Sequence, residues 1–161
     1  MIKYMSKITN ERRNALEKYT TFSCEETSSL GAKLMDNNRG ELFVALFGDL
    51  GAGKTAFVKG MVNYFLPDAI VTSPTYNIVN TYSDGNVVLH HYDMYRITDE
   101  DDLYSVGFYD NLSGSITVAE WCENIPWALP ESYIKVTILK DLEDDNKRYI
   151  EMEYVNADTR T

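Results

Sequence analysis

Residues 42–55 read LFVALFGDLGAGKT, an apolar run that passes directly into a glycine-rich loop. The first six residues are apolar without alternation, which is typical of a parallel strand buried on both faces. The last eight match the phosphate-binding pattern G-x-x-x-x-G-K-[ST] in full. A helix is predicted over residues 53–65, because Phe57, Met61 and Phe65 are spaced to face a core. Strand, loop and helix together predict a P-loop nucleotide-binding domain of the α/β class.

The residue types of this loop suit the binding of a polyphosphate. Glycines let the backbone curl so that successive amides point at phosphate oxygens, and the helix N-terminus adds partial positive charge. Lys54 would reach the β- and γ-phosphates, and the Thr55 hydroxyl would bind Mg²⁺. The predicted nucleotide-binding residues of the loop are Leu50, Gly51, Ala52, Gly53, Lys54 and Thr55.

A P-loop needs a second anchor for Mg²⁺, usually a carboxylate at the C-terminal end of a buried strand. Residues 116–120 (ITVAE) and 87–93 (VVLHHYD) are apolar stretches that end in an acid, Glu120 and Asp93. Ligands of open α/β sheets collect at the carboxyl ends of strands, so both acids are well placed. The residues alone leave open which of the two holds the metal and which positions the attacking water.

Two further helices are predicted. One follows Ser23, whose hydroxyl can form a capping box with Glu26, and its inner face would carry Leu30 and Leu34. The other is short and acidic and would be capped by Thr98. These helices and the one after the P-loop would flank the sheet.

The remaining strands are predicted from β-branched, aromatic or alternating stretches. They are residues 19–22, 70–71, 77–82, 87–92, 116–119, 134–139 and 148–154. The order of strands and helices predicts a mixed, partly parallel sheet flanked by helices. We expect one ATPase-like domain, residues 19–161, after an N-terminal extension of residues 1–18.

The chain of 161 residues carries a net charge of −10, which argues against a stand-alone nucleic-acid binder. Between Gly60 and Ile134, Arg96 is the one basic residue. That stretch is either an ordinary solvated surface, or a surface that meets a basic partner or uses a cation to hold an anion. Its acids are Asp68, Asp84, Asp93, Asp99, Glu100, Asp101, Asp102, Asp110, Glu120, Glu123 and Glu131.

The chain shows no targeting or metal-cluster signature. It has no apolar run of about 20 residues and no apolar core of a secretory signal, so a cytoplasmic location without membrane contact is expected. Cys24 and Cys122 lie far apart, which excludes a disulfide framework and favours buried thiols. His90 and His91 lack a zinc-binding pattern and are interpreted as structural.

Three further features have both a structural and a functional interpretation. Thr75, in the segment SPTY of residues 73–76, is either a capping hydroxyl in a turn or a switch residue that meets the γ-phosphate or its Mg²⁺. Arg96 is either part of a structural ion pair or a charge at the phosphate site. Trp121 and Trp127 either pack at the edge of a core or stack on a base.

Four motifs, taken together, make the chain recognisable. They are residues 48–55 (GDLGAGKT), 72–76 (TSPTY), 91–96 (HYDMYR) and the pair Glu120-Trp121. Their order and spacing resemble the TsaE family of small bacterial P-loop ATPases, also called YjeE. The resemblance implies slow ATP hydrolysis and a role in forming threonylcarbamoyladenosine on tRNA. It also implies work with a TsaD–TsaB pair, which carries out the transfer to tRNA, so that tRNA is met only through these partners.

The resemblance also implies roles for single residues. Lys54 would bind phosphate, and Thr55 with Glu120 would hold Mg²⁺. Asp93 would orient or activate the attacking water or assist through the metal, and Thr75 would be the switch threonine. The other implied nucleotide contacts are Trp121 and, more loosely, Cys24 and Arg148.

Two other functions compete with a partner-dependent ATPase. A small-molecule P-loop kinase would need Arg or Lys residues to clamp the transferred phosphoryl group, and mid-chain only Arg96 is available. A nucleotide-dependent binding module, in which hydrolysis is incidental, would suit the acidic mid-region equally well.

Overall fold

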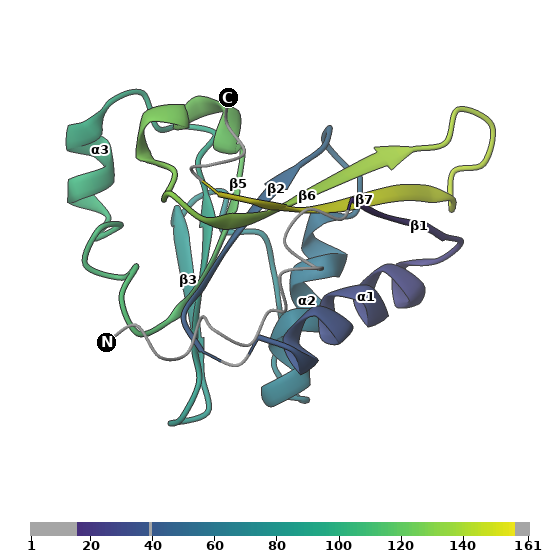
Figure 1. Cartoon of the computed structure of the whole chain (residues 1–161), viewed down its shortest axis with the longest axis horizontal. Coiled ribbons are helices and arrows are strands. Elements are labelled where there is room, and N and C mark those ends of the chain that lie inside the picture. Colours follow the sequence, from purple (N-terminus) through teal and green to yellow (C-terminus); the bar gives the residue numbers. More distant parts are fainter. Residues whose placement is uncertain (1–15, 39, 157–161) are drawn as a thin grey trace.

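The computed structural model describes residues 16–38 and 40–156, which form one mixed sheet with helices (Figure 1). The strands are β1 (Glu17–Thr21), β2 (Leu42–Phe47), β3 (Val79–Ser83), β4 (Val88–Asp93), β5 (Ile116–Glu120), β6 (Tyr133–Lys140) and β7 (Arg148–Val155). The helices are α1 (Cys24–Asp36), α2 (Lys54–Phe65) and α3 (Glu100–Ser105), with the 3-10 turns η2 (Cys122–Asn124) and η3 (Pro126–Ala128). Residues 1–15, most of the predicted N-terminal extension, lie outside the described residues.

The seven strands follow the order β1-β7-β6-β2-β5-β4-β3. The centre is parallel, since β2 pairs in parallel with both β5 and β6, and β4 pairs in parallel with β5. The pairs β1–β7, β6–β7 and β3–β4 are antiparallel. This arrangement confirms the predicted α/β fold with a mixed, partly parallel sheet.

The two faces of the sheet are covered differently, as the alternation along β2 shows. Val44 and Leu46 pack with Phe57 and Met61 of α2 in one core cluster. Phe43 and Ala45 point to the opposite face. There they belong to a second cluster, which is completed by side chains of α3 and of the loops around it. Figure 1 accordingly shows α3 well apart from α1 and α2.

Helices α1 and α2 approach each other through glycines. A Cβ atom on Gly31 would lie 2.0 Å from the Phe57 carbonyl oxygen, and one on Gly60 would lie 1.7 Å from the Ser28 carbonyl oxygen. The buried residues of α1 are Thr27, Gly31 and Met35. Leu30 and Leu34 pack against the core cluster as predicted, but they stay half-buried because close backbone packing turns the small-residue side of the helix fully inward.

Replacing Gly60 with alanine tests this packing. Alanine favours the helix by about 1 kcal/mol, but the clash with backbone forces the helices apart and costs about 3 kcal/mol. We expect a net loss of about 2 kcal/mol in the free energy of unfolding, measured by urea denaturation. Gly40→Ala is the control, since a Cβ there would meet no atom within 4 Å. Equal stability of the two variants would contradict the close approach.

Several local predictions were wrong. Residues 70–71 form no strand; Ile70 is 86% exposed, and the sheet ends at β3. The cap of α3 is Asp99, whose Oδ1 accepts from the Asp102 amide at 3.0 Å. Thr98 lies one residue before this cap, and its amide and hydroxyl donate to Asp102 Oδ2 at 2.9 and 3.0 Å.

One of the two hydrogen bonds of the predicted capping box forms at the N-terminus of α1. Ser23 Oγ accepts from the Glu26 amide at 3.1 Å, but Glu26 Oε2 accepts from the Phe22 amide at 2.7 Å, one residue before the expected donor. Cys24 is exposed in the first turn of α1, which contradicts the predicted buried thiol. Cys122 is buried as expected, and burial raises the pKa of its thiol.

Candidate functional site

The P-loop joins the end of β2 to the start of α2, in the order that the sequence predicts. Gly48, Gly51 and Gly53 adopt φ values of 149°, 73° and 110°, a region that side chains with a Cβ rarely enter. A Cβ on Gly48 would also lie 2.5 Å from the carbonyl oxygen of Ile138 on β6. The loop can therefore curl against the sheet only because these positions are glycine.

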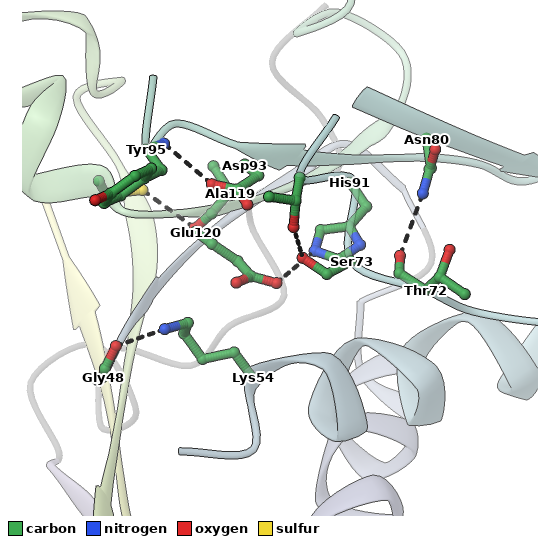
Figure 2. A network of polar contacts seen from close by, with 12 residues as sticks. Gly48, Lys54, Thr72, Ser73, Asn80, His91, Asp93, Tyr95, Ala119 and Glu120 are labelled. Atoms are coloured by element: carbon green, nitrogen blue, oxygen red, sulfur yellow. Dashed lines mark hydrogen bonds and ion pairs between the residues drawn. The ribbon is translucent and has the colours of Figure 1, made fainter. Parts of the chain in front are cut away.

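Lys54 extends back along the loop (Figure 2). Its Nζ donates to the carbonyl oxygens of Gly48 at 2.5 Å and Asp49 at 3.3 Å, and the side chain is buried. The ammonium also lies 4.8 Å from the ring centroid of Trp121. Phosphate oxygens are stronger acceptors of an ammonium than neutral carbonyls, so an anionic ligand in the loop would attract this side chain.

The two candidate carboxylates lie on neighbouring strands. Asp93 at the end of β4 pairs in register with Glu120 at the end of β5, and Glu120 pairs with Leu46 of β2. Since the three strands are parallel, their carboxyl ends meet at the edge where the P-loop begins. Alternation places both acids on the face that packs against α2, together with Leu46. The two acids therefore lie at the edge of the sheet where the P-loop begins, as their places at strand ends predict.

Both carboxylates are nearly buried. Asp93 is 6% and Glu120 is 4% exposed. Asp93 Oδ1 accepts from the Tyr95 amide at 3.0 Å, and Glu120 Oε1 bonds to His91 Nε2 at 2.8 Å. Two buried carboxylates side by side are costly unless cations compensate them. Their hard oxygen donors fit Mg²⁺, which commonly binds one or two carboxylates together with substrate phosphates.

The acids do not form a complete metal site by themselves. Within residues 16–38 and 40–156, no group of three or more His, Cys, Asp or Glu could hold a metal ion. A Mg²⁺ ion at this edge would take its remaining ligands from Thr55, nucleotide phosphates and water, as metals at P-loops do. The donor set thus fits a metal that arrives with a nucleotide.

The segment of Thr75 lies beside the end of β4. Thr75 is exposed, and its Oγ1 lies 3.2 Å from Ser73 Oγ. The Asn80 side chain donates to the Thr72 carbonyl at 3.2 Å, and Ile78 closes the turn with φ of 67°. The guanidinium carbon of Arg96 lies 5.5 Å from the ring centroid of Tyr76, so its recorded contact is with an aromatic ring and not with an acid as in a structural ion pair. This contact joins the motif of residues 72–76 to the motif of residues 91–96.

Trp121 directly follows Glu120 and adopts the left-handed conformation, with φ of 59°. This conformation turns its ring toward Lys54 and toward Tyr95, whose ring centroid lies 5.1 Å away. Trp127 is 51% exposed and has no recorded ring contact with Lys54 or Tyr95. The structure thus places Trp121, of the two tryptophans, beside the P-loop lysine.

The chain is similar to known proteins along most of its length. The family model "Threonylcarbamoyl adenosine biosynthesis protein TsaE" matches residues 21–150. The chain belongs to the TsaE family. Its members act in tRNA threonylcarbamoyladenosine biosynthesis, so the role predicted from the four motifs is confirmed at this level.

The matched regions span most of each relative and most of this chain. The TsaE protein of Rickettsia conorii is 37% identical over 131 residues, which cover 81% of this chain and 74% of the relative. The TsaE protein of Bacillus subtilis is 32% identical over 130 residues, with coverage of 81% and 82%. A crystal structure of Bacillus subtilis YdiB superposes with a TM-score of 0.71 and 28% identity, covering 88% of this chain and 86% of YdiB.

In this TsaE-family chain, Arg148 at the start of β7 supports the P-loop from outside. Its Nε donates to the Ala52 carbonyl at 2.8 Å, and Nη2 donates to the Gly51 carbonyl at 3.4 Å. Lys140, its register partner on β6, has its Nζ 3.2 Å from the Cβ position of Gly51. The resemblance implied a nucleotide contact for Arg148, which stays a prediction; in the structure its guanidinium donates to the loop backbone.

Thr27, Lys140 and His91 lie next to the loop or its acids but were not predicted from the sequence. The predicted residue Cys24 has no recorded contact with the loop. Thr27, one turn later in α1, has its Cγ2 3.8 Å from the position that a Cβ of Gly53 would take. His91 alternates with Asp93 along β4, and that spacing of two was a signal that both share one face of the sheet.

Replacing Arg148 with methionine is expected to weaken nucleotide binding about tenfold, because the guanidinium holds two P-loop carbonyls and hydrogen bonds from charged groups contribute about 1.5–3 kcal/mol. Isothermal titration calorimetry with ADP and Mg²⁺ measures the loss. Lys147→Met is the control, since Lys147 pairs with Asp141 at 3.6 Å instead. If both variants bind ADP as the wild type does, Arg148 does not support the loop.

Within the described ranges, no helix is long and apolar enough to cross a membrane.

Proposed function

We propose that this TsaE-family chain is a Mg²⁺-dependent ATPase that hydrolyses ATP slowly alone and supports a TsaD–TsaB-like complex in modifying tRNA. The observation that carries the proposal is that the P-loop and two nearly buried carboxylates, Asp93 and Glu120, lie at one edge of the sheet. Lys54, Asp93 and Glu120 supply the charges that phosphoryl transfer requires.

We assign the following roles to the residues of this site. Lys54 and the loop amides bind the phosphates, while Thr55 and Glu120 are the ligands we assign to Mg²⁺. When bound, the ion neutralises negative charge on the phosphate oxygens. Asp93 is fixed through Oδ1 by the Tyr95 amide, and its other oxygen would orient the attacking water. Trp121 would border the nucleotide, and Thr75 would close over the γ-phosphate or its metal.

The arginines favour dependence on a partner. Arg96 and Arg148 are the two arginines of the described residues, and each has another task. Arg96 stacks over Tyr76, and Arg148 holds the P-loop backbone. A P-loop enzyme without an arginine at the transferred phosphoryl group hydrolyses slowly until a partner completes the site. Slow hydrolysis alone follows from this arrangement.

The charge of the chain favours proteins over tRNA as direct partners. A net charge of −10 disfavours direct contact with the phosphates of tRNA. The exposed acids at the start of α3 suit contact with a basic protein surface. We infer a cytoplasmic protein that meets tRNA through the TsaD–TsaB-like complex.

The proposal is tested by measuring phosphate release from ATP and Mg²⁺ with the chain alone, with a TsaD–TsaB pair, and with the pair and tRNA. We expect feeble hydrolysis alone and a rise of roughly tenfold or more in the full mixture, equivalent to about 1.4 kcal/mol of added transition-state stabilisation. Fast phosphoryl transfer to an added metabolite without partners would support the kinase instead. No rise with partners would contradict the proposal.

A further inference from the structure

His91 is a fully buried histidine beside the proposed metal ligand. It lies on β4 opposite Val118 of β5, two residues before Asp93, and its side chain is 0% exposed. Its Nε2 lies 2.8 Å from Glu120 Oε1, as Figure 2 shows. The pair spans the two strands whose ends carry the acids. His91 therefore touches the carboxylate and lies behind it, away from the P-loop.

The hydrogen bonds of the ring fix its chemistry. Glu120 acting as a metal ligand would be a carboxylate that can only accept, and Nε2 would then carry the proton of this bond. Nδ1 is buried and has no hydrogen-bond partner among the described residues. A proton on Nδ1 in place of Nε2 would leave a buried donor unpaired and the carboxylate bond unmade. The position thus holds a buried polar ring whose one recorded partner is Glu120.

The bond also separates two opposite charges. Lys54 and Glu120 face the same space, but Lys54 donates to the Gly48 and Asp49 carbonyls, and no Lys54–Glu120 ion pair within 4.0 Å is recorded in the described part of the chain. Figure 2 shows the Glu120 carboxylate turned toward His91 and the Lys54 ammonium turned toward Gly48. A carboxylate free to rotate would be drawn to the ammonium and fill the place of the ligand.

We propose that His91 is a positioning residue: its Nε2–H holds Oε1 of Glu120, so that Oε2 is presented to Mg²⁺ and the carboxylate stays apart from Lys54. This inference rests on the proposed function, because it assigns the second layer of the same Mg²⁺–nucleotide site. Histidine–carboxylate contacts behind a metal ligand act in this way, and their loss commonly lowers metal affinity 10–100-fold.

The test compares ADP binding to the full chain in Mg²⁺ and in EDTA by calorimetry. For the wild type we expect tighter binding in Mg²⁺. His91→Asn, whose amide is too short to reach the carboxylate, should lose about tenfold of that gain and keep the affinity measured in EDTA. His91→Gln can place an amide N–H near the position of Nε2 and should keep most of the gain. A full Mg²⁺ gain in His91→Asn would overturn the proposal.

Two further outcomes separate this inference from the proposed function. A wild-type chain that binds no ADP under either condition would refute the nucleotide site itself. ADP binding without any gain from Mg²⁺ would leave the P-loop assignment intact and overturn the role of His91. If His91→Asn does not fold, the imidazole ¹⁵N spectrum of the wild type decides: we expect a proton on Nε2, and a ring protonated on Nδ1 alone would overturn the proposal.

Discussion

Replacing Lys54 with alanine is expected to lower the affinity for ATP about 100-fold and to remove measurable hydrolysis. The Lys54 side chain is buried in the P-loop, where its ammonium donates to the Gly48 and Asp49 carbonyls, and it is the basic group that we assign to the phosphates. A charge-assisted hydrogen bond to phosphate contributes about 3 kcal/mol, which corresponds to roughly a hundredfold in the dissociation constant. Calorimetry with a non-hydrolysable ATP analogue and a phosphate-release assay measure the two effects.

Lys59→Ala is the matched control for this variant. Lys59 lies on the same helix but is exposed, so the Lys59→Ala variant should bind and hydrolyse ATP as the wild type does. Thermal unfolding should show that both variants remain folded. If Lys54→Ala kept wild-type hydrolysis, the P-loop assignment would have to be abandoned.

Replacing Asp93 with asparagine is expected to separate binding from turnover. The substitution keeps the size of the side chain, and an amide oxygen can still accept from the Tyr95 amide. It removes the charge that would orient or deprotonate the attacking water, and groups in such roles commonly contribute 10²–10⁴-fold to the rate. We therefore expect partner-stimulated hydrolysis to fall by about that factor, while the affinity for Mg²⁺–ATP changes by less than about threefold.

Asp68→Asn, an exposed substitution just beyond α2, provides the control and should leave both quantities unchanged. An Asp93→Asn protein that hydrolyses ATP at the wild-type rate would remove Asp93 from the mechanism. A variant that loses binding together with turnover would instead assign Asp93 to the metal.

Local patterns were sufficient to predict the centre of this fold. The apolar run of β2, the glycines of the loop and the spacing of apolar residues in α2 are contiguous in the chain, so their structure follows from nearest-neighbour physics. Asp93 and Glu120 were placed together correctly because carboxyl ends of parallel strands share an edge. No knowledge of the exact register was needed for that step.

The parts that were missed depend on contacts between distant segments. Arg148 and Ala52 lie 96 residues apart in the chain, and their hydrogen bond exists because β6 pairs in parallel with β2 and carries β7 alongside. The bond from His91 to Glu120 likewise needs the β4–β5 register. The close approach of α1 and α2 at Gly31 and Gly60 was not predicted either, because hydrophobic spacing identifies the core-packed leucines of α1 but gives no signal for a contact between glycines.

Threonylcarbamoyladenosine formation on tRNA by a purified TsaD–TsaB pair supplied with an activated threonylcarbamoyl donor, assayed over many turnovers with and without this chain, tests the proposed ATPase role most directly. We predict that product accumulates beyond one equivalent per complex only when the wild-type chain and ATP are present, and that Lys54→Ala cannot replace the wild type. Equal product over many turnovers without the chain, or with Lys54→Ala, would contradict a partner-dependent ATPase.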